Sequence, residues 1–475
     1  MVRARFSPSP TGLLHLGNAR AALFSALYAE KEKGVFILRI EDTDLARSDQ
    51  KYTELLEEDL HWLGIHWQEG PGVGGAHQPY WQSKRHDIYD HYYKQLEKQG
   101  LVYPCFCTEQ ELALNRKIQL SRGQPPRYPG TCRQLSQEDI AKKLAKGLKP
   151  ALRFRVPLKK SIEFVDLVKG KQHFNSDDIG DFIVRRMDGT ASFLFCNAID
   201  DSLMEVTHVL RGDDHLANTP RQLMILTALN MSAPQYGHLS MITGDDGTPL
   251  SKRHGSFSLH DLYSQGYLPI AALNYLARLS HTYEQTTLMD FKELAKLFKI
   301  EKISRAPARF DKNQLLYWQK EAVMRLDDQA ALDWLGAQTL EKVPEEKKTV
   351  FAELMRKNIL FPEEGYTWAS IFFSDEPQFT HEQIAVLKEA SENFFIAAED
   401  AVKKHGADLK SVCDHLKTTL NISGKKLFMP LRIALTGEQD GPELAQVAAL
   451  LGKEKMLQHF NHALNIVRKE DAANL

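Results

Sequence analysis

The sequence predicts an α/β region at the N-terminus, whose parallel sheet binds ligands at one edge, followed by an all-helical C-terminal third. Three observations carry this prediction. A strand, a turn and a helix follow one another over residues 2–34, and an apolar strand comes directly after them. From about Phe310 onward, apolar residues recur at helical spacing without a convincing strand. The chain has 475 residues, which is too long for one ordinary core, so we expect about two to four domains.

The N-terminal strand, turn and helix contain the core of the predicted site. Val2–Phe6 alternates apolar and basic residues, as a strand does, and a Pro-rich turn follows. A helix is expected from Ala19 to Gly34, with His15 and Asn18 at its N-terminus. Unpaired backbone N–H groups and the helix dipole favour an anion there, and His15 can donate to a phosphate oxygen. The pattern predicts a nucleotide site without a Walker lysine.

Gly17 lies in the same turn and has no Cβ, so a flat base could pack against its backbone. The alternative is an ordinary βα turn with a surface histidine, because so short a motif has a real false-positive risk.

A second strand is expected at Val35–Ile40, an apolar run typical of a buried parallel strand. It is followed by Glu41, Asp42 and Asp44, at the edge where doubly wound sheets bind their ligands. Carboxylates in this position also cap helices and form turns. Of the three, we expect Glu41 to hold a substrate ammonium group.

The middle of the chain differs from its surroundings in having short strands. Asp188-Gly189 predicts a two-residue hairpin turn between strands at 182–184 and 192–195. Thr219-Pro220 predicts an N-cap and first residue of a helix. The remaining periodic segments are predicted as strands at 152–156 and 162–168, and as helices at 85–98, 262–279, 315–326, 329–335, 346–355, 382–404 and 445–467.

Asp245–Ser256 is polar, rich in turn residues and basic at its end, which predicts a mobile loop. Lys252 on this loop could reach the β- and γ-phosphates of a nucleotide and stabilise a departing pyrophosphate. The alternative is a solvated basic loop without a ligand.

The net charge of −2 excludes a strongly basic chain, so any RNA-binding surface must be local. One candidate is Asn115–Arg133, which holds five basic residues and no acidic one. No secretory h-region and no apolar run of about 18 residues is present, so we expect a cytoplasmic protein without a membrane partner. Five cysteines in such a chain do not predict disulfides.

The His15 turn and the Lys252 loop together resemble the HIGH and KMSKS motifs of class I aminoacyl-tRNA synthetases. Three further segments are similar to motifs of the bacterial type of glutamyl-tRNA synthetase: Arg5–Gly12, Arg39–Asp44 and Arg211–His215. The resemblance covers nearly the whole chain, including Leu427–Gly437 near its end.

This resemblance implies a Rossmann-like α/β catalytic domain with an α+β insertion, followed by an all-α anticodon-binding region. The implied parts are the two halves of the catalytic domain at 1–100 and 191–240, the inserted acceptor-end-binding domain at 101–190, a stem-contact domain at 241–309 and the anticodon-binding region at 310–475.

The implied reaction attaches L-glutamate to tRNA(Glu) through a glutamyl adenylate, using ATP and Mg²⁺, in a monomeric enzyme. The carboxylate of glutamate is the nucleophile, so positioning and charge stabilisation carry the catalysis. Matching positions assign catalysis to His15, Asn18, Lys252 and Arg253; ATP binding to His15, Gly17, Asp214, Ser251 and Lys252; and glutamate binding to Arg5, Ser9, Glu41, Asn197 and Arg211. For Arg211 the alternative is an ordinary ion pair with Asp213 or Asp214.

Two positions depart from the family pattern. Phe193 stands where the family usually has Tyr, which removes a hydroxyl from the expected glutamate pocket, and Pro249 replaces the first Lys of the loop. We expect activity because Lys252 is retained, with reduced affinity for glutamate or ATP.

The resemblance also suggests a zinc site, because thiolates suit Zn²⁺ and Cys105, Cys107 and Cys132 group together. Some relatives have His two residues after the third Cys, where this chain has Gln134. Tyr128 could complete the site instead, as in related tRNA-modifying enzymes. Three free thiols are the alternative.

Four other functions remain open from the sequence. Glutaminyl-tRNA synthetase has a C-terminal region that resembles β-barrels, the short enzyme that glutamylates a modified tRNA base lacks an anticodon domain, and small-molecule adenylyltransferases are shorter. An RNA-binding paralogue without catalysis is the fourth. Whether tRNA(Gln) is also charged, and which C-terminal residues read the anticodon, does not follow from the sequence.

Overall fold

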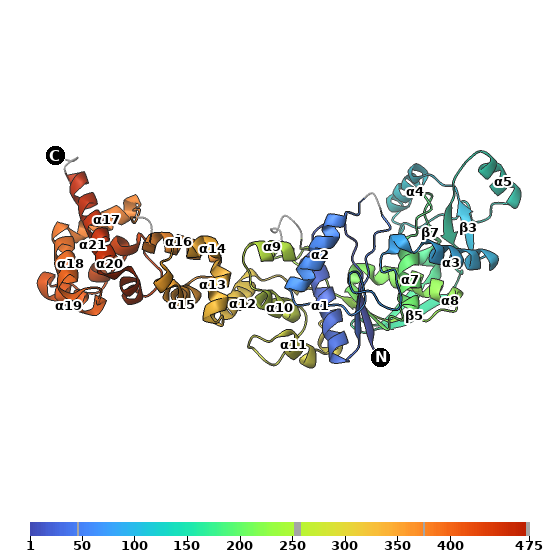
Figure 1. Cartoon of the computed structure of the whole chain (residues 1–475). Helices are drawn as coiled ribbons and strands as arrows, with labels where there is room; N and C mark the ends of the chain where they lie inside the picture. Colours follow the sequence, from blue (N-terminus) through green and yellow to red (C-terminus); the bar gives the residue numbers. More distant parts are fainter. Residues whose placement is uncertain (45–46, 251–257, 374–375, 472–475) are drawn as a thin grey trace. The chain divides into compact units, whose positions relative to one another are not determined.

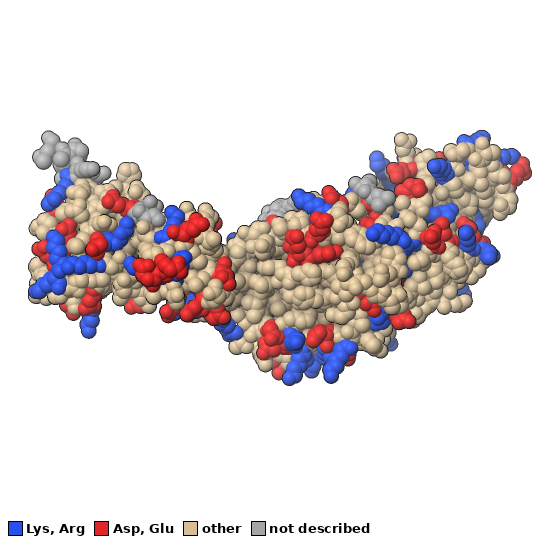
Figure 2. Space-filling model, in the orientation of Figure 1, with Lys and Arg blue, Asp and Glu red and all other residues tan. Residues whose placement is uncertain are grey.

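The computed structural model describes residues 1–44, 47–250, 258–373 and 376–471 (Figure 1). The chain forms two compact units. The first comprises Met1–Ser264 and Pro269–Leu315, and the second comprises Gln265–Leu268 and Leu316–Leu475. On the face drawn in Figure 2, basic and acidic side chains alternate over both units, as expected from a net charge close to zero.

The first unit is built on a four-stranded parallel sheet in the order β2-β1-β8-β9. The strands are β1 (Arg3–Phe6), β2 (Val35–Leu38), β8 (His208–Gly212) and β9 (Gln235–Leu239). The predicted strands at 2–6 and 35–40 are therefore present, paired in parallel with Arg5 opposite Ile37. In β8 and β9, Arg211 lies opposite His238.

Helix α1 (Leu16–Lys31) packs against β1 and β8 and against two later helices, α10 and α11. It buries residues on nearly all sides, including the charged Arg20, because both the sheet and these helices cover it. It begins three residues before the predicted start at Ala19, and His15 is its N-cap residue. The other elements of this part are α2 (Gln50–Trp62), a 3₁₀ turn η1 (Gln82–Lys84) and α3 (His86–Lys98).

The inserted region forms two small antiparallel sheets, one in the order β3-β4-β7 and one a hairpin of β5 and β6. Its elements are β3 (Val102–Cys105), α4 (Glu109–Ser121), α5 (Gln137–Ala145), β4 (Ala151–Phe154), β5 (Ser161–Asp166), β6 (Gly170–Asn175), α6 (Ser176–Ile179) and β7 (Phe182–Arg185).

The predicted hairpin at Asp188-Gly189 is only half correct. The turn is present, since the Arg186 N–H donates to the Thr190 carbonyl at 2.8 Å. The expected second strand at 192–195 is wrong, because those residues begin helix α7 (Phe193–Leu203) after a single bridge between Arg185 and Ala191. Apolar residues at the start of a buried helix look like a short strand when only four are considered.

Two helix predictions in the first unit are also corrected. Helix α8 (Thr219–Ala228) has Asn218 as its N-cap residue, so Thr219 is not the cap; its hydroxyl contacts Arg211 instead. The helix expected at 262–279 is two helices, α9 (Leu259–Ser264) and α10 (Pro269–Arg278). The remaining elements are η2 (Asp213–Asn218), β10 (Ile242–Thr243), α11 (Phe291–Leu297), η4 (Ile300–Lys302) and β11 (Ala308–Arg309).

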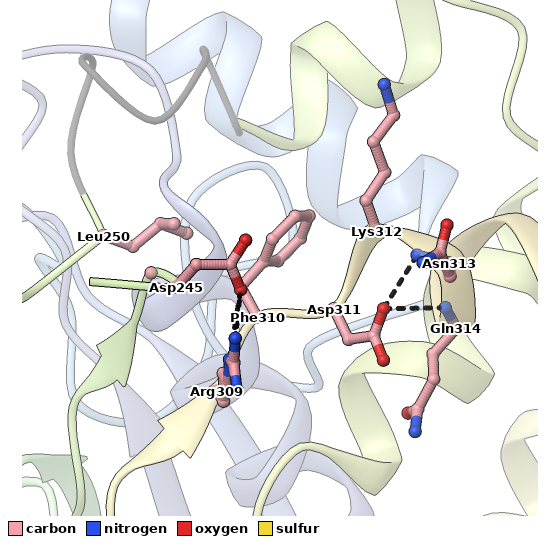
Figure 3. Close-up of a pocket in the computed structure, with 9 residues that line it drawn as sticks. Asp245, Leu250, Arg309, Phe310, Asp311, Lys312, Asn313 and Gln314 are labelled. Atoms are coloured by element: carbon pink, nitrogen blue, oxygen red, sulfur yellow. Dashed lines mark hydrogen bonds and ion pairs between the residues drawn. The ribbon is translucent and has the colours of Figure 1, made fainter. Parts of the chain in front are cut away.

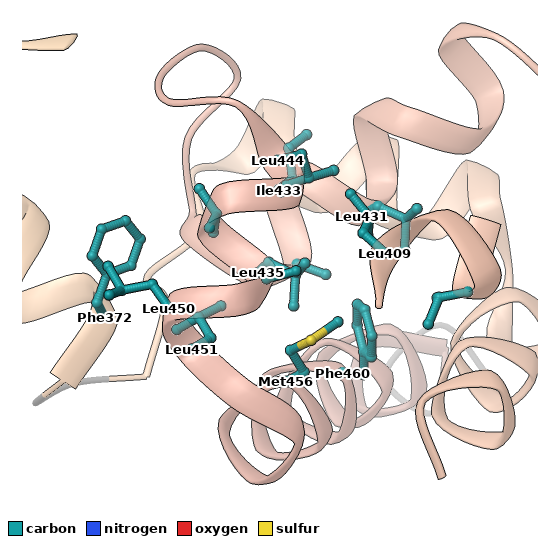
Figure 4. Packing of buried hydrophobic residues seen from close by; sticks show 14 of the residues in the cluster. Phe372, Leu409, Leu431, Ile433, Leu435, Leu444, Leu450, Leu451, Met456 and Phe460 are labelled. Atoms are coloured by element: carbon teal, nitrogen blue, oxygen red, sulfur yellow. The ribbon is translucent and has the colours of Figure 1, made fainter. Parts of the chain in front are cut away.

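The second unit is helical throughout its described residues, as predicted. Its core includes Leu431, Leu435 and Phe460, all fully buried (Figure 4). The helices, with α12 beginning in the first unit, are α12 (Lys312–Met324), α13 (Asp328–Leu335), α14 (Ala337–Leu340), η5 (Glu345–Lys347), α15 (Lys348–Asn358), α16 (Pro362–Phe373), α17 (His381–Ala390), α18 (Glu392–His405), α19 (Leu409–Leu420), α20 (Lys425–Thr436) and α21 (Leu444–Asp471).

Two long helices predicted here are interrupted. The segment 382–404 breaks at Ser391, which lies between α17 and α18. Its φ of 73° is not helical. The segment 445–467 lies within α21, which kinks at Gly452. No helix among the described residues combines the length and the apolar character that a membrane span requires.

Candidate active site

Charged side chains gather at the carboxyl ends of the parallel strands. Arg5 lies on β1, Glu41 follows β2 and Arg211 lies on β8, and helix α7 adds Asn197. All four are buried, with at most 6% of each residue exposed. Since burying an unpaired charge is costly, such a group needs internal partners or a ligand.

Asp201 on α7 holds two of the buried arginines. Arg5 donates from Nε and Nη2 to its two carboxylate oxygens, both at 3.2 Å, and Arg39 Nη1 lies 2.8 Å from Oδ1. Arg39 Nη2 also donates to Asn197 Oδ1 at 2.9 Å. Although burial raises the pKa of Asp201, Arg5 and Arg39 outweigh it and lower that pKa. Asp201 is therefore ionised and fixes both guanidinium groups.

Glu41 is a buried carboxylate in this cluster with one unpartnered oxygen. Its Oε1 accepts no hydrogen bond from a described residue, although Arg39 Nη2 lies 3.7 Å away. Burial raises the pKa of Glu41 to about 7, against the opposing effect of Arg39 and Arg5. A cation that reached Oε1 would favour the ionised form.

Arg211 contacts no carboxylate within the part of the chain that the structure describes and is held by three neutral side chains. Its Nε donates to His238 Nε2 at 3.2 Å, and its Nη2 donates to Thr219 Oγ1 and Gln222 Oε1, both at 2.8 Å. Its Nη1 is buried and has no partner among the described residues. Burial lowers the pKa of Arg211 to about 10. One donor pair is thus left free for an anion.

The structure does not pair Arg211 with Asp213 or Asp214, the alternative role considered for it from the sequence. Asp213 pairs with Lys169 at 3.1 Å, and Asp214, which is exposed, lies 3.6 Å from His215. His215 also faces Phe193, with ring centroids 5.1 Å apart. Burial, with repulsion from Arg211, lowers the pKa of His215 to about 4.

The turn before α1 is open to solvent. His15, Gly17 and Asn18 are exposed, and the His15 side chain makes no cap hydrogen bond to the helix. A Cβ built on Gly17 would meet nothing within 4 Å. The N-terminal N–H groups of a 16-residue helix are therefore accessible to an anion. Ser9 is exposed as well.

The basic loop connects to this turn through its described neighbours. Ser258 pairs with His15 in an antiparallel bridge, and the Leu259 N–H donates to the Leu14 carbonyl at 2.9 Å. At the other end, the Leu250 N–H donates to the Ile242 carbonyl at 2.9 Å. Of the predicted site residues, Ser251, Lys252 and Arg253 lie outside the described residues.

A polar pocket of about 750 Å³ lies beside Leu250 (Figure 3). Arg309 donates to Asp245 across it at 2.9 Å, and Asp311 accepts the backbone N–H groups of Asn313 and Gln314. The predicted site residues that the structure describes do not line this pocket. It is therefore separate from the cluster at the strand ends.

The three grouped cysteines meet in the inserted region. Their Sγ atoms lie within 4.8 Å of one another, with Cys107 and Cys132 at 3.6 Å. The hydroxyl of Tyr128 lies 3.4 Å from Cys105 Sγ and 3.5 Å from Cys107 Sγ. In a tetrahedron with Zn–S bonds of about 2.3 Å, sulfurs are about 3.8 Å apart, so this donor set fits Zn²⁺. Burial raises the pKa of Cys107 to about 11, so a cation is needed to ionise it.

Sequence reasoning missed several residues of the strand-end cluster. Asp201 carried a usable signal, because an acidic residue on the buried face of an apolar helix needs a cationic partner. His238 carried a weaker signal, because strand β9, with the sequence QYGHL, is not an apolar run. Gln222 and Thr219 carried none, because polar residues in the first turns of helices are common.

Comparison with known proteins matches this arrangement. A model of the class I tRNA synthetase (E and Q) catalytic domain matches residues 1–317, and one of an anticodon binding domain matches residues 322–464. The chain is 50% identical to glutamate–tRNA ligase 2 of Coxiella burnetii strain RSA 331 over 463 residues, which is 98% of this chain and 100% of that protein. It is also 50% identical to glutamate–tRNA ligase 2 of Nitrosococcus oceani, with 98% of each chain covered.

A solved structure agrees. The crystal structure of a glutamate tRNA ligase from Elizabethkingia meningosepticum, in complex with its amino acid, superposes with a TM-score of 0.87 at 30% identity, covering 98% of this chain and 99% of that one. The predicted α/β catalytic domain and helical C-terminal region, and the family resemblance drawn from the motifs, are confirmed. The chain belongs to the glutamate–tRNA ligase family of class I tRNA synthetases.

Proposed function

We propose that this enzyme attaches L-glutamate to tRNA(Glu), through a glutamyl adenylate formed from ATP with release of pyrophosphate. The observation that carries the proposal is Arg211, a buried cation whose Nη1 has no partner among the described residues. A substrate with a side-chain carboxylate would complete its hydrogen bonds. The relatives named glutamate–tRNA ligase support the same substrate.

Glutamate would be held at both ends by the strand-end cluster. Arg211 binds its side-chain carboxylate, with Arg5 adding positive charge, and Glu41 binds its ammonium group. Asn197 and Ser9 complete the pocket. The free α-carboxylate then attacks the α-phosphate of ATP, and no covalent protein intermediate is needed.

ATP would lie at the N-terminus of α1. His15 and Asn18 stabilise the α-phosphate as it passes through five-coordination, and Gly17 leaves room for the base. Asp214 and Ser251 bind ATP, and Lys252 with Arg253 neutralises the leaving pyrophosphate. Mg²⁺ bound to ATP supplies additional charge neutralisation on the phosphates.

For the tRNA we keep the five-part division expected from the family. The inserted region, 101–190, binds the acceptor end, and a pocket of about 390 Å³ there is lined by Arg116, Arg127, Arg153 and Arg221 among others. Residues 241–309 contact the stem and 310–475 bind the anticodon. We further propose that the enzyme acts in the cytoplasm as a monomer, as the family resemblance implies.

We also propose that Cys105, Cys107, Tyr128 and Cys132 hold a structural Zn²⁺. Metal analysis of protein purified without added zinc should give close to one Zn²⁺ per chain, and Cys107→Ser should lower it. A stoichiometry near zero in the unmutated protein means three free thiols.

Charging of purified tRNA(Glu) and tRNA(Gln) with labelled glutamate tests the function. Charging of tRNA(Glu) alone supports a discriminating enzyme, and charging of tRNA(Gln) implies an amidotransferase partner. If neither is charged, the proposal fails and an RNA-binding paralogue becomes the better explanation.

Lys252→Ala, assayed with tRNA present, should lower adenylate formation at least ~10²-fold, a typical loss for one transition-state contact.

A further inference from the structure

Behind Arg211 lies a buried pair of side chains that the proposed mechanism does not use. Asp166 ends strand β5 of the inserted region, and His238 lies on β9 of the parallel sheet. Their side chains are fully buried, and His238 Nδ1 lies 2.5 Å from Asp166 Oδ2. The two regions meet here, since the Leu167 N–H also donates to the Tyr236 carbonyl at 2.8 Å.

Asp166 acts as an acceptor only. Its Oδ1 accepts the backbone N–H groups of Val168, Lys169 and His238 at 2.9, 2.7 and 3.2 Å. Although burial raises the pKa of Asp166, these donors and the His238 ring outweigh it and lower that pKa. An ionised Asp166 requires a proton on the nitrogen that faces it, which is Nδ1 of His238.

His238 is therefore neutral, with Nε2 as an acceptor. Burial and the nearby Arg211 charge lower the pKa of His238, although Asp166 opposes this. Its single proton is on Nδ1, so Nε2 has a free lone pair. Arg211 Nε, which always carries a hydrogen, lies 3.2 Å from that lone pair.

The guanidinium plane of Arg211 follows from this contact. With Nε fixed by His238 and Nη2 fixed by Thr219 and Gln222, the planar group has one orientation, and Nη1 is the donor left over. In the other His238 tautomer Nε2 would carry a hydrogen, which Thr219 Oγ1, 3.1 Å away, could accept, and Arg211 Nε would lose its acceptor.

We propose that Asp166 and His238 are positioning residues for glutamate: Asp166 sets the His238 tautomer, which fixes Arg211 so that Nη1 faces the substrate carboxylate. The inserted region thus contributes to amino-acid affinity as well as to RNA contacts. The proposal rests on the proposed role of Arg211 in binding glutamate.

The turn that follows Asp166 also has a structural role, because the Val168 carbonyl accepts a hydrogen bond from Arg305 Nε at 2.9 Å. A substitution of Asp166 can therefore disturb this turn as well as His238. Two substitutions of His238 separate the roles. His238→Gln keeps an acceptor near the position of Nε2 but loses the donor to Asp166. His238→Asn keeps that donor but loses the acceptor for Arg211.

The experiment measures KM for glutamate and for ATP in tRNA charging by the full-length enzyme. We expect His238→Asn and Asp166→Asn to raise the glutamate KM about tenfold, His238→Gln to raise it less than about threefold, and the ATP KM to stay within about twofold. His281→Asn, at another buried histidine of the first unit, is the control and should leave the glutamate KM unchanged.

The outcomes are distinct. Equal effects of His238→Asn and His238→Gln, the reverse order, or equal rises in both KM values overturn the positioning role. If Arg211→Gln leaves the glutamate KM unchanged, the role of Arg211 itself is wrong. If the variants do not fold, ¹⁵N NMR of the histidines in the unmutated enzyme still decides: a proton on Nδ1 of His238 supports the proposal, and one on Nε2 overturns it.

Discussion

At the scale of single residues, the proposed role of Glu41 in binding an ammonium group depends on its charge. Its pKa is raised to about 7 by burial, above the value of 4.5 for the free side chain. The contribution of Glu41 to stability is therefore complete below about pH 4.5 and is lost as the pH rises through about 7. The affinity for glutamate should rise with pH over the same range, because its ammonium group binds the ionised form of Glu41.

We therefore expect the glutamate KM to fall about tenfold between pH 6 and pH 8, since roughly a tenth of Glu41 is ionised at pH 6. Glu41→Gln should raise KM and remove the pH dependence. Steady-state charging at saturating ATP and tRNA measures this. A KM independent of pH in the unmutated enzyme would contradict the assignment of Glu41.

Phe193 is the second residue at which we expect a substitution to change the affinity for glutamate. It is half-buried, at the start of α7, and its ring faces His215. Phe193→Tyr restores the hydroxyl usual in the family and should lower the glutamate KM or leave it unchanged. The ATP KM serves as the control. A clear rise for glutamate alone would mean that the pocket has adapted to Phe.

The position of Glu41 could be predicted because it follows an apolar strand, at the edge where such sheets bind ligands. Arg5 and Arg211 could be assigned only through the family resemblance, and the structure brings Arg5 close to Glu41. Which residues pair with one another to hold the site could not be predicted. Asp201 and Asp166 reach it from a helix and from an inserted hairpin, and no local pattern reports which distant strand such a residue contacts.

At the scale of the element, the start of α1 combines a helix terminus with the proposed ATP site. Gly17 lies in the first turn, has an ordinary φ and has free space where a Cβ would be. Gly17→Ala should raise the free energy of unfolding by up to about 1 kcal/mol, because Ala is the better helix former. The same methyl group should raise the ATP KM if a base packs there.

Urea unfolding and ATP kinetics measure the two effects, with the glutamate KM as control. An unchanged ATP KM would remove Gly17 from the nucleotide site, while an unchanged stability would only mean that the first turn tolerates glycine.

Element boundaries show where sequence patterns fail. The break at Ser391 has no Gly or Pro to mark it, since Ser391 itself adopts the positive φ. The kink at Gly452 lies within a continuous apolar repeat, which hides it. Helical periodicity alone cannot report either position, because the apolar spacing continues on both sides of each.

At the scale of the whole molecule, each unit has its own core, and the proposed glutamate site lies entirely in the first. Helix α20 of the second unit offers a matched pair of positions. Leu431 is fully buried in the core of that unit, whereas 46% of Phe428 is exposed. Substitutions of the two to Ala remove large apolar side chains from the same helix with different consequences.

We expect Leu431→Ala to lower the free energy of unfolding of the second unit by about 2–5 kcal/mol, because it leaves a cavity. Phe428→Ala should change it by less than about 1 kcal/mol. Urea unfolding followed by circular dichroism compares them. Below the unfolding transition, both variants should keep the glutamate KM of the unmutated enzyme, since no residue of the proposed glutamate pocket belongs to the second unit. A raised glutamate KM in Leu431→Ala would show that the amino-acid site depends on the helical unit for its geometry.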